Sequence, residues 1–530
     1  VILYTDILSG PNTGGENNNG AYLSIFGKGF GTTRGTSTVK INGIEVATYK
    51  QWGAPSKVYD SHGIQVITVQ PGVSVTSGSV VVTVGGEASN SDHSFKIHAG
   101  DIYFVNGQTG NNSTGVANDI TKPYLGVQYV SDLAAFGAGD TIVIRGGTYS
   151  VSGQGANFLR WDPLSGTSDS PMAVIGYPGE IINITKGSTG ECRFSYYNGG
   201  GSYSTTANLN LDCNPSSTAF LSNSFVGNVR IVNNDFKGMH GSSGGSGLVT
   251  GAWHHTKILG NAVHEIGDTK LYHGIYLSCT DTDLAEEIEV GWNHVYDAFY
   301  GAACGVGSED CSGRLIQLYN GLGPGFTNVS IHDNVLHDGS RHAISLGYTA
   351  TGIKVYNNII YRTGLGVDQE SGIRINHSGV VGAEWYNNIG YDNANGLFAF
   401  DSGSSMTVRN NINIVLPGQI YESGAMDRNN ITDSNNLFYG AGSLPAWADS
   451  ATSINADPIF VDPNSPARNF HLQVGSPAID SGTAVSVSRD FDGTLRPQGS
   501  AFDIGAYEYC ISNCTVDAAP PTKRTKVLVK

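Results

Sequence analysis

The chain has 530 residues, of which 72 are glycine and only 14% are charged. This length exceeds what one compact core normally organises, so we expect several domains or one elongated body. The glycine-rich composition, without long stretches of helical period, is typical of strands and turns. The net charge of −16 leaves no basic stripe for phosphate groups, which argues against a nucleic-acid partner. It also disfavours a polyanionic substrate, unless calcium or local arginine and histidine residues reverse the field.

Residues 1–97 alternate apolar and polar side chains with the period of β-strands. The segments are AYLSIFGKGFG, TVKINGIEVA, GIQVITVQPG, GSVVVTVGGEASN and SFKIH. Short strands at this spacing predict a small β-sandwich, which we place at residues 1–98. The segments resemble the successive strands of the IPT/TIG immunoglobulin-like fold, although the connection YKQWGAPSKVYDSHG is longer than usual. The resemblance implies a spacer or docking domain of a secreted bacterial protein, with glycan binding as the alternative.

A repeat follows, and its most regular feature is one asparagine. Segments such as VRIVNNDFKGM, TKILGNAVHEIG and GIKVYNNIIYRTG align at intervals of 23 to 41 residues. Varying intervals with a shortest step in the low twenties are typical of a solenoid whose loops differ in length. The aligned residues are Asn234, Asn261, Asn293, Asn334, Asn358, Asn388, Asn411 and Asn436.

A buried amide costs a few kcal/mol unless its hydrogen bonds are satisfied. In a parallel β-helix, equivalent residues stack about 4.8 Å apart, so each asparagine can donate to one neighbour and accept from the other. Asparagine also tolerates the left-handed backbone of a sharp bend. We therefore interpret the column as a structural ladder without a catalytic role.

Two further columns lie outside the ladder. We expect one to stack as rings, and the other to be mostly acidic, with Arg362 relieving the repulsion between Asp338 and Asp392. The remaining carboxylates are either solvated or bind a cation such as calcium. The ring column is His264, Tyr296, His337, Tyr361 and Tyr391, and the acidic column is Glu265, Asp297, Asp338, Arg362 and Asp392.

A second strand aligns in each coil through HGIYLS, YGAACG, HAISLG, SGIRIN and NGLFAF. The alignment predicts inward columns of Ile275, Ala302, Ile344, Ile373 and Leu397, and of Leu277, Cys304, Leu346, Ile375 and Ala399. The predicted outward column is Tyr276, Ala303, Ser345, Arg374 and Phe398.

The two ends of this region resemble those of secreted right-handed parallel β-helix proteins of the pectate-lyase-like superfamily. At residues 102–150, a Gly-Asn loop, KPY, a short amphipathic helix and GDTIVIRGGTYS look like an opening coil. NADPIFVDPNSPARNFHLQVGSPAIDSG and RDFDGTLRPQGSAFDIGAYEY look like a closing segment. The resemblance implies an all-β chain with a right-handed parallel β-helix solenoid at residues 99–509, and a tail or linker at 510–530. This superfamily contains lyases, hydrolases, epimerases and inert adhesins, so the fold leaves the reaction open.

The seven cysteines suggest an oxidising compartment. Cys304 with Cys311 and Cys510 with Cys514 are close enough to close small disulfide loops, and Cys192 with Cys213 could form a third bridge. Cys279 is left over in an apolar strand pattern, so we expect a buried thiol. Because no signal peptide or long apolar run is present, we expect a secreted or cell-surface chain whose signal has been removed.

Polar residues concentrate near the predicted outward column. A lyase acting on a uronic acid needs a group that neutralises the carboxylate and a base that removes the C5 proton. The arginine and histidine residues of this region could supply both, but they could equally be solvated or paired with acids. The candidate catalytic residues are Arg374, His377, His342, Arg341, Glu370 and Asp368.

Other residues near this face are candidates for binding. His273, Tyr276, Ser345, Phe398 and Asp401 are the predicted substrate-binding residues. Glu309 and Asp310 are candidate calcium ligands, and calcium is the only cofactor that we consider. A glycoside hydrolase would need two carboxylates about 5 to 10 Å apart, for which Asp368 with Glu370 or Glu309 with Asp310 could serve.

We predict a secreted polysaccharide-active enzyme, more readily a lyase than a hydrolase, that acts on a polysaccharide or cell-surface glycan. The alternative is a non-catalytic adhesive or fibre-forming protein, for which self-assembly is possible. Low charge and abundant glycine fit that alternative as well. No nucleic acid and no membrane span are expected.

Overall fold

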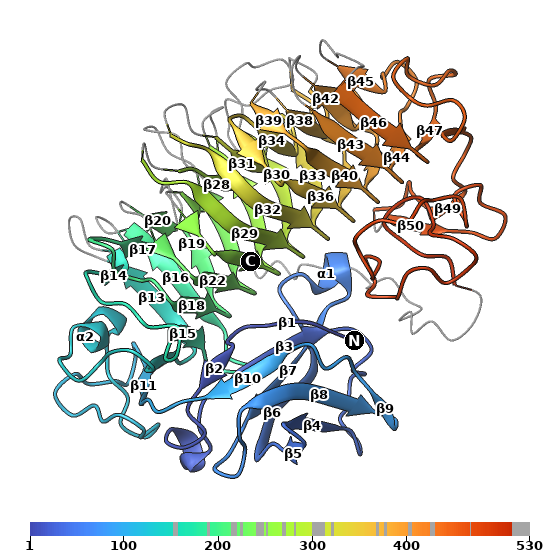
Figure 1. Cartoon of the computed structure of the whole chain (residues 1–530). Helices are drawn as coiled ribbons and strands as arrows, with labels where there is room; N and C mark the ends of the chain where they lie inside the picture. The colour runs from blue at the N-terminus through green and yellow to red at the C-terminus, as the bar shows by residue number, and fades with distance from the viewer. Residues whose placement is uncertain are drawn as a thin grey trace, which may run out of the picture.

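The computed structural model of the chain describes most of its length, and the regular secondary structure of that part is nearly all β-strand (Figure 1). The described residues are 1–151, 157–187, 191–213, 220–222, 226–239, 249–250, 253–267, 272–279, 282–298, 313–319, 323–366, 370–375, 379–400, 405–423, 430–466 and 468–510.

The N-terminal residues form a β-sandwich, as predicted. One antiparallel sheet has the order β1 (Ile2–Thr5), β3 (Leu23–Gly27), β7 (Gln65–Gln70) and β6 (Thr48–Pro55). The other has the order β2 (Ser9–Gly10), β10 (Ser94–Ile97), β8 (Gly78–Val84), β4 (Thr38–Ile41) and β5 (Ile44–Glu45), with β9 (Glu87–Ala88) beside β8. A 3-10 turn (Glu16–Asn18) and the helix α1 (Tyr59–His62) interrupt the strands.

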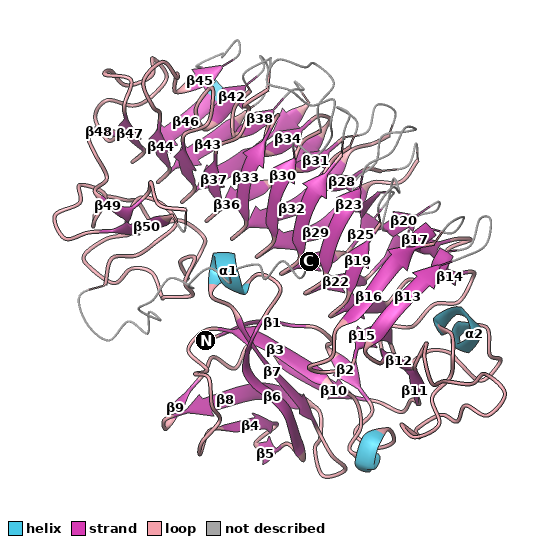
Figure 2. Ribbon diagram, turned by 180° about the vertical axis from the view of Figure 1, so that it is seen from behind, coloured by secondary structure: helices cyan, strands magenta, loops and turns pink. Residues whose placement is uncertain are grey.

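The rest of the chain winds into a parallel β-helix (Figures 1 and 2). Strands of successive coils pair with one another and form three sheets that run along the solenoid. The first sheet contains β11 (Ile102–Val105), β12 (Thr141–Ile144), β15 (Met172–Gly176), β18 (Ser204–Ala207), β22 (Val229–Val232), β26 (Lys257–Leu259), β29 (Ala285–Gly291), β32 (Phe326–His332), β36 (Lys354–Tyr356), β40 (Ala383–Tyr386), β43 (Met406–Arg409) and β46 (Ile431–Ser434). Two short strands, β35 (Ala350–Thr351) and β39 (Val380–Val381), pair at its edge.

The second sheet follows the first around each coil. It contains β13 (Gly147–Val151), β16 (Ile182–Lys186), β19 (Asn210–Asp212), β23 (Asp235–Met239), β27 (Ala262–Ile266), β30 (His294–Ala298), β33 (Val335–Gly339), β37 (Ile359–Tyr361), β41 (Ile389–Tyr391), β44 (Ile412–Ile414), β47 (Leu437–Tyr439) and β48 (Ile454–Asn455). The helix α2 (Val127–Ser131) precedes it at the N-terminal end of the solenoid.

The third sheet carries the candidate site and has two parts. The early coils supply β14 (Asn157–Trp161), β17 (Glu191–Tyr196), β20 (Phe220–Ser222) and β24 (Val249–Thr250), with a short pair β21 (Val226–Gly227) and β25 (Trp253–His254) alongside. The later coils supply β28 (Ile275–Leu277), β31 (Ile316–Leu318), β34 (Ile344–Leu346), β38 (Ile373–Ile375), β42 (Phe398–Phe400) and β45 (Glu422–Ser423).

The asparagine ladder is confirmed, and all eight side chains are fully buried. Asn358 shows the pattern, because its Oδ1 accepts from the backbone N–H (3.1 Å) and Nδ2 (2.9 Å) of Asn334. Its own Nδ2 donates to Asn388 Oδ1 at 3.0 Å and to the Ile331 carbonyl at 2.9 Å. The ladder therefore satisfies the amides and also one backbone N–H in each coil.

The prediction that the ladder asparagine itself adopts the left-handed backbone is wrong, because the bend lies one residue earlier. Positive φ angles fall on the residue before each ladder asparagine, for example Asn357 (52°) before Asn358 and Asn387 (56°) before Asn388. The ladder residue itself has no positive φ angle, and its side chain makes the hydrogen bonds between coils. In one coil the bend residue is a tryptophan, Trp292, at 55°.

The predicted ring column is confirmed on the outer face of the second sheet. The rings of His264 and Tyr296 stack at 5.0 Å, those of Tyr296 and His337 at 5.2 Å, and those of His337 and Tyr361 at 4.5 Å. Beside them, Arg362 Nε lies 2.6 Å from Asp338 Oδ1, as expected of the one basic residue in the acidic column.

The sandwich lies against the outer face of the first sheet, and the two share one hydrophobic cluster (Figure 1). The sheet contributes an apolar column in register, namely Phe104, Val143, Ile175, Ala207, Val232 and Leu259. Polar contacts frame this cluster, since Arg230 Nε donates to the Asp6 carbonyl at 2.9 Å and Asn208 Nδ2 to Asp6 Oδ2 at 3.1 Å. The sandwich therefore packs against the side of the solenoid.

The C-terminal part folds back beside the later coils, where β49 (Phe460–Asp462) pairs with β50 (Asn469–Leu472) (Figure 2). The segment around Asp492 then reaches the sandwich, where Lys28 Nζ lies 2.6 Å from Asp492 Oδ1. His62 of α1 contacts the Asp333 carbonyl at 2.9 Å and stacks on Phe491. Sandwich, solenoid and closing segment thus meet at one junction.

Of the predicted disulfides, Cys192–Cys213 is present, and Cys279 is a buried thiol. Cys510 is disulfide-bonded, whereas Cys304, Cys311 and Cys514 lie outside the described residues. In the ranges that the structure describes, no helix is long and apolar enough to cross a membrane.

Candidate functional site

The later strands of the third sheet bring several predicted site residues together. Their outer column, in register, is Tyr276, Gln317, Ser345, Arg374 and Ala399. Arg341, His342 and Glu370 lie just before β34 and β38, next to this column. We call Arg341, His342, Glu370 and Arg374 the Arg-His-Glu cluster.

Glu370 is the centre of the cluster. Its Oε1 accepts from Arg341 Nη1 at 2.9 Å, and its Oε2 accepts from the backbone N–H of His342 at 2.9 Å. Oε2 also lies 3.3 Å from His342 Nε2, and Arg374 Nη1 approaches that same nitrogen at 3.5 Å. One carboxylate therefore holds an arginine and an imidazole from the preceding coil.

A glycine turn places Glu370 there. Gly364 has φ of +71°, and a Cβ at this position would lie 1.7 Å from the Glu370 carbonyl oxygen. Only glycine fits this close approach. The Glu370 backbone N–H in turn donates to the Gly364 carbonyl at 3.2 Å, and the Asn395 N–H donates to the Glu370 carbonyl at 3.3 Å. The local sequence thus fixes the carboxylate before β38 begins.

His273 extends the site toward β28. Its ring stacks on Tyr276 at 5.1 Å, and its Nδ1 accepts the backbone N–H of Arg314 at 2.9 Å. Burial, together with the charges of Arg314 and Arg341, lowers the pKa of His273 to about 3. Its imidazole is therefore neutral at neutral pH.

The charge states within the cluster follow from burial and from the arginines. Burial lowers the pKa of His342 to about 4, and Arg374 and Arg314 add to this effect while Glu370 opposes it. Burial alone would raise the pKa of Glu370, but His342, Arg314 and Arg341 hold it below its ordinary value. At neutral pH, the cluster therefore contains an ionised carboxylate and a neutral imidazole.

His342 Nδ1 lies 2.8 Å from the Ser371 carbonyl and 3.1 Å from the Ser371 N–H. His342 Nε2 faces Glu370 Oε2 at 3.3 Å and Arg374 Nη1 at 3.5 Å, so each ring nitrogen has both a donor and an acceptor beside it.

Arginines outnumber carboxylates among the described residues of the cluster. Arg314, Arg341 and Arg374 lie around the carboxylate of Glu370. This concentration of arginine contrasts with the net charge of −16 of the whole chain. Guanidinium groups suit bidentate binding of a carboxylate.

The structure corrects two of the strand alignments. Phe398 was expected to face outward, but it pairs with Ile373 in the interior and is fully buried, so Ala399 takes the outward place. The prediction that YGAACG forms the coil after HGIYLS is also wrong, because Ile275 pairs with Ile316 and Ile316 with Ile344. The strand in that place is β31.

This second correction explains two residues that the sequence reasoning missed, Arg314 and Gln317. The segment RLIQL repeats the pattern of HAISL, with Arg314 in register with His342 and Gln317 with Ser345. That pattern could have identified them. The remaining candidates, His377, Asp368, Asp401, Glu309 and Asp310, lie outside the described residues.

Calcium has no suitable donor set in the part of the cluster that the structure describes. Calcium takes six to eight oxygen ligands, whereas this part offers one carboxylate among three guanidinium groups. Across the described ranges, no group of three or more His, Cys, Asp and Glu side chains could hold a metal ion.

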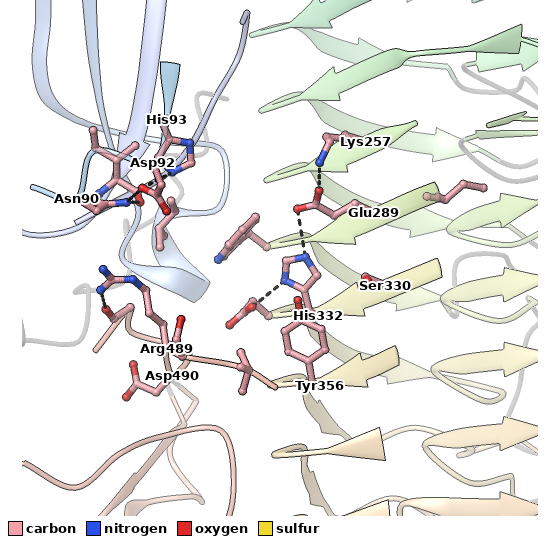
Figure 3. Close-up of a pocket in the computed structure, with 18 of the residues that line it drawn as sticks. Asn90, Asp92, His93, Lys257, Glu289, Ser330, His332, Tyr356, Arg489 and Asp490 are labelled. Carbon is pink, nitrogen blue, oxygen red and sulfur yellow. Dashed lines mark hydrogen bonds and ion pairs between the residues drawn. The ribbon is translucent and has the colours of Figure 1, made fainter. Parts of the chain in front are cut away.

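A second candidate is the cleft of about 510 Å³ at the junction of sandwich, solenoid and closing segment. Figure 3 shows Asn90, Asp92 and His93 of the sandwich facing Lys257, Glu289, Ser330, His332 and Tyr356 of the solenoid, with Arg489 and Asp490 at one end.

The polar groups of this junction cleft are engaged with one another. His332 Nδ1 lies 2.8 Å from Asp333 Oδ2, its Nε2 lies 3.3 Å from Glu289 Oε1, and Lys257 binds the other oxygen of Glu289. The His332 ring also stacks on Tyr356 at 4.8 Å. Burial alone would lower the pKa of His332, but the two carboxylates raise it to about 9. These contacts join neighbouring coils of the solenoid, so the charged groups on this wall of the cleft are paired with one another.

The comparisons with known proteins add the following. No protein-family model and no curated protein matches the chain. Among solved structures, pectate lyase Pel9A aligns with 77% of this chain and 96% of its own, at 13% identity and a TM-score of 0.47. The complex of XylC with xylose aligns with 77% and 99%, at 10% identity and a TM-score of 0.47.

The A-module of mannuronan C-5 epimerase AlgE4 from Azotobacter vinelandii aligns with 62% of this chain and 90% of its own, at 15% identity and a TM-score of 0.37. Likenesses of this size leave the reaction open, since one fold serves many reactions.

Proposed function

We propose that this protein is a secreted or cell-surface carbohydrate-active protein that binds an acidic glycan at the Arg-His-Glu cluster and cleaves it by β-elimination. The observation that carries the proposal is a group of arginines beside a carboxylate and a neutral imidazole. Among the described residues, Arg314, Arg341 and Arg374 lie around Glu370 and His342 in a chain of net charge −16. Guanidinium groups at one place supply donors and positive charge for an anionic ligand.

The proposed reaction assigns a role to each group. Arg341 and Arg374 bind the carboxylate of a uronic acid and stabilise the negative charge that develops on it when C5 loses its proton. His342 Nε2 accepts that proton, the electron pair forms the C4–C5 double bond, and the C4–O bond breaks. The leaving oxygen then takes up a proton. An incoming carboxylate raises the pKa of His342, because opposite charge favours the imidazolium.

A glycoside hydrolase is less well supported. It needs a protonated acid and a second carboxylate. Within the described residues the cluster offers only Glu370, and Glu370 is held ionised by Arg341 and His342. The other notable alternative, a non-catalytic glycan-binding protein, uses the same arginines without the proton transfer.

The proposed location and the proposed class of the sandwich have separate support. The Cys192–Cys213 disulfide supports an oxidising, extracytoplasmic compartment. We propose that the sandwich belongs to the IPT/TIG immunoglobulin-like group, as its strand segments suggest.

The test is incubation with a panel of uronate polymers and neutral glycans, with and without calcium. We expect ultraviolet absorbance from an unsaturated uronate product with at least one uronate polymer. Arg374→Gln should lower the rate about 100-fold, since it removes a charged donor to the transition state. Arg409→Gln is the matched control, because Arg409 is a partly exposed arginine on the outer face of the first sheet.

Each alternative outcome has a distinct reading. New reducing ends without ultraviolet absorbance would indicate a hydrolase. Binding of a uronate that Arg374→Gln abolishes, without any product, would indicate the non-catalytic protein. Equal losses in Arg374→Gln and Arg409→Gln would contradict a site at the cluster.

A further inference from the structure

Two polar side chains in the outer column of the third sheet are buried and incompletely hydrogen-bonded. Gln317 is 6% exposed and Ser345 is 0% exposed, and they occupy adjacent strands in register. Within the described part of the chain, Gln317 Oε1 and Ser345 Oγ have no hydrogen-bond partner.

Such atoms call for an explanation, because a buried polar atom without a partner destabilises the folded state. Alanine or an aliphatic residue would avoid this cost, and the neighbouring columns of the same strands use isoleucine and leucine. Gln317 and Ser345 differ from these neighbouring columns in facing outward from the sheet. Retaining a glutamine and a serine there points to a contact made with another molecule.

Both residues border the Arg-His-Glu cluster. Ser345 lies between Gln317 and Arg374 in the column, and His342 precedes it by three residues on the same coil. Arg374 Nη1 reaches His342 Nε2 at 3.5 Å, so its guanidinium group extends from its own coil toward that of Ser345. A ligand at the arginines is therefore adjacent to both side chains.

We propose that Gln317 and Ser345 form a hydroxyl-binding subsite that selects a uronate sugar with unsubstituted ring hydroxyl groups. The subsite rests on the proposed function, since Arg341 and Arg374 hold the sugar carboxylate. Gln317 Oε1 can only accept, so the ligand must offer an O–H donor to it, while Ser345 Oγ can donate or accept. An O-acetyl group at this hydroxyl removes the donor and adds bulk, so the acetylated sugar is rejected.

The test uses Ser345→Ala and Gln317→Met, with Ser330→Ala as the matched control on the outer face of the first sheet. Binding is measured calorimetrically with oligogalacturonate, oligoalginate and oligoglucuronate, each beside its O-acetylated form. Both variants should weaken binding of the unsubstituted oligomer about five- to tenfold, the amount expected for one hydrogen bond. The acetylated oligomer should bind the wild type more weakly than the unsubstituted one does. Its dissociation constant should be the same for both variants as for the wild type.

A second measurement separates this role from a structural one. Without ligand, the urea midpoints of both variants should equal or exceed that of the wild type, since each variant removes an unpartnered buried atom. Lower midpoints with unchanged selectivity would overturn the subsite. So would equal losses for the two forms of the oligomer.

The two proposals fail in different ways. If the wild type binds none of the oligomers, the proposed function fails and the subsite with it. If Arg374→Gln abolishes binding but Ser345→Ala and Gln317→Met leave the selectivity unchanged, only the subsite is refuted.

Discussion

The outer faces of the first and third sheets each contain buried side chains, but of different chemistry. The first sheet presents an apolar column from Phe104 to Leu259, which the sandwich covers. The third sheet presents a column that includes Gln317, Ser345 and Arg374, next to a buried ion pair between Arg341 and Glu370. Burial of apolar area stabilises a fold, whereas burial of charge adds little net stability. We therefore interpret the first face as structural, and the third as the face to which the proposed function applies.

The first sheet changes character where the sandwich ends. The column that begins with Phe104 continues through Gly291 to His332 and Tyr356. There the apolar column gives way to charged side chains that pair with one another within the solenoid. Apolar contact with the sandwich therefore covers the early part of this face, and ion pairs between coils occupy the part beyond it.

The largest expected effect concerns the apolar contact. Ile175→Asp places an unpaired carboxylate beneath the sandwich and should lower the free energy of unfolding by about 3–5 kcal/mol. Urea denaturation measures the change. Ile181→Asp is the matched control, because Ile181 is 69% exposed and its replacement should cost less than about 0.5 kcal/mol. If the two variants were equally stable, the sandwich would not stay on the solenoid in solution.

The two faces should also respond oppositely to pH. The pKa of His332 is raised from 6.5 to about 9, so its contribution is complete below pH 6.5 and disappears as the pH rises through 9. The pKa of His342 is lowered from 6.5 to about 4, so its contribution is complete above pH 6.5 and disappears as the pH falls toward 4. Each change should amount to about 3 kcal/mol.

Urea denaturation between about pH 3 and about pH 10, roughly one unit beyond the two pKa values, checks both windows. His332→Gln should flatten the alkaline side of the stability profile and leave the acid side, while His342→Gln should do the reverse. A shared window for both variants would contradict the assigned charge states.

The smallest effect concerns a charged pair that belongs to neither face. Arg362 and Asp338 are 2.6 Å apart but 45% and 35% exposed. Arg362→Gln should therefore lower the free energy of unfolding by less than about 1 kcal/mol, and added salt should reduce the difference further. Unfolding at low and high salt tests this. A larger loss would show that the acidic column on the second sheet is more strongly coupled than its exposure implies.

The ladder and the inward residues of β28, β34 and β38 could be predicted because they repeat. Asn358 and Asn388 recur with the same neighbours, and a period of one coil leaves few alternative alignments. The sequence did not identify Arg314 and Gln317 because YGAACG, which precedes them, has the same apolar pattern as the strands of the third sheet. It was therefore aligned in the place that β31 occupies. Loop length varies between coils, so apolar pattern alone does not decide which segment enters the sheet.

Phe398 shows a second limit. In NGLFAF, leucine, phenylalanine and alanine all suit either face, so the pattern does not fix the register to one residue. The structure settles it through the pairing of Phe398 with Ile373, which places two phenylalanines, Phe398 and Phe400, inside. A shift of one residue moved a predicted binding residue into the core.

The sequence by itself determined the two kinds of β-structure, the coil repeat, the ladder and the neighbourhood of Arg341, His342 and Arg374, because local spacing encodes strands and in-register stacking. Only the tertiary structure decided that the sandwich covers the first sheet, that Glu370 joins the arginines, and that Gln317 and Ser345 remain unpartnered beside them. Those features depend on contacts between residues far apart in the chain, and burial and pKa depend on what covers a side chain rather than on its neighbours in sequence.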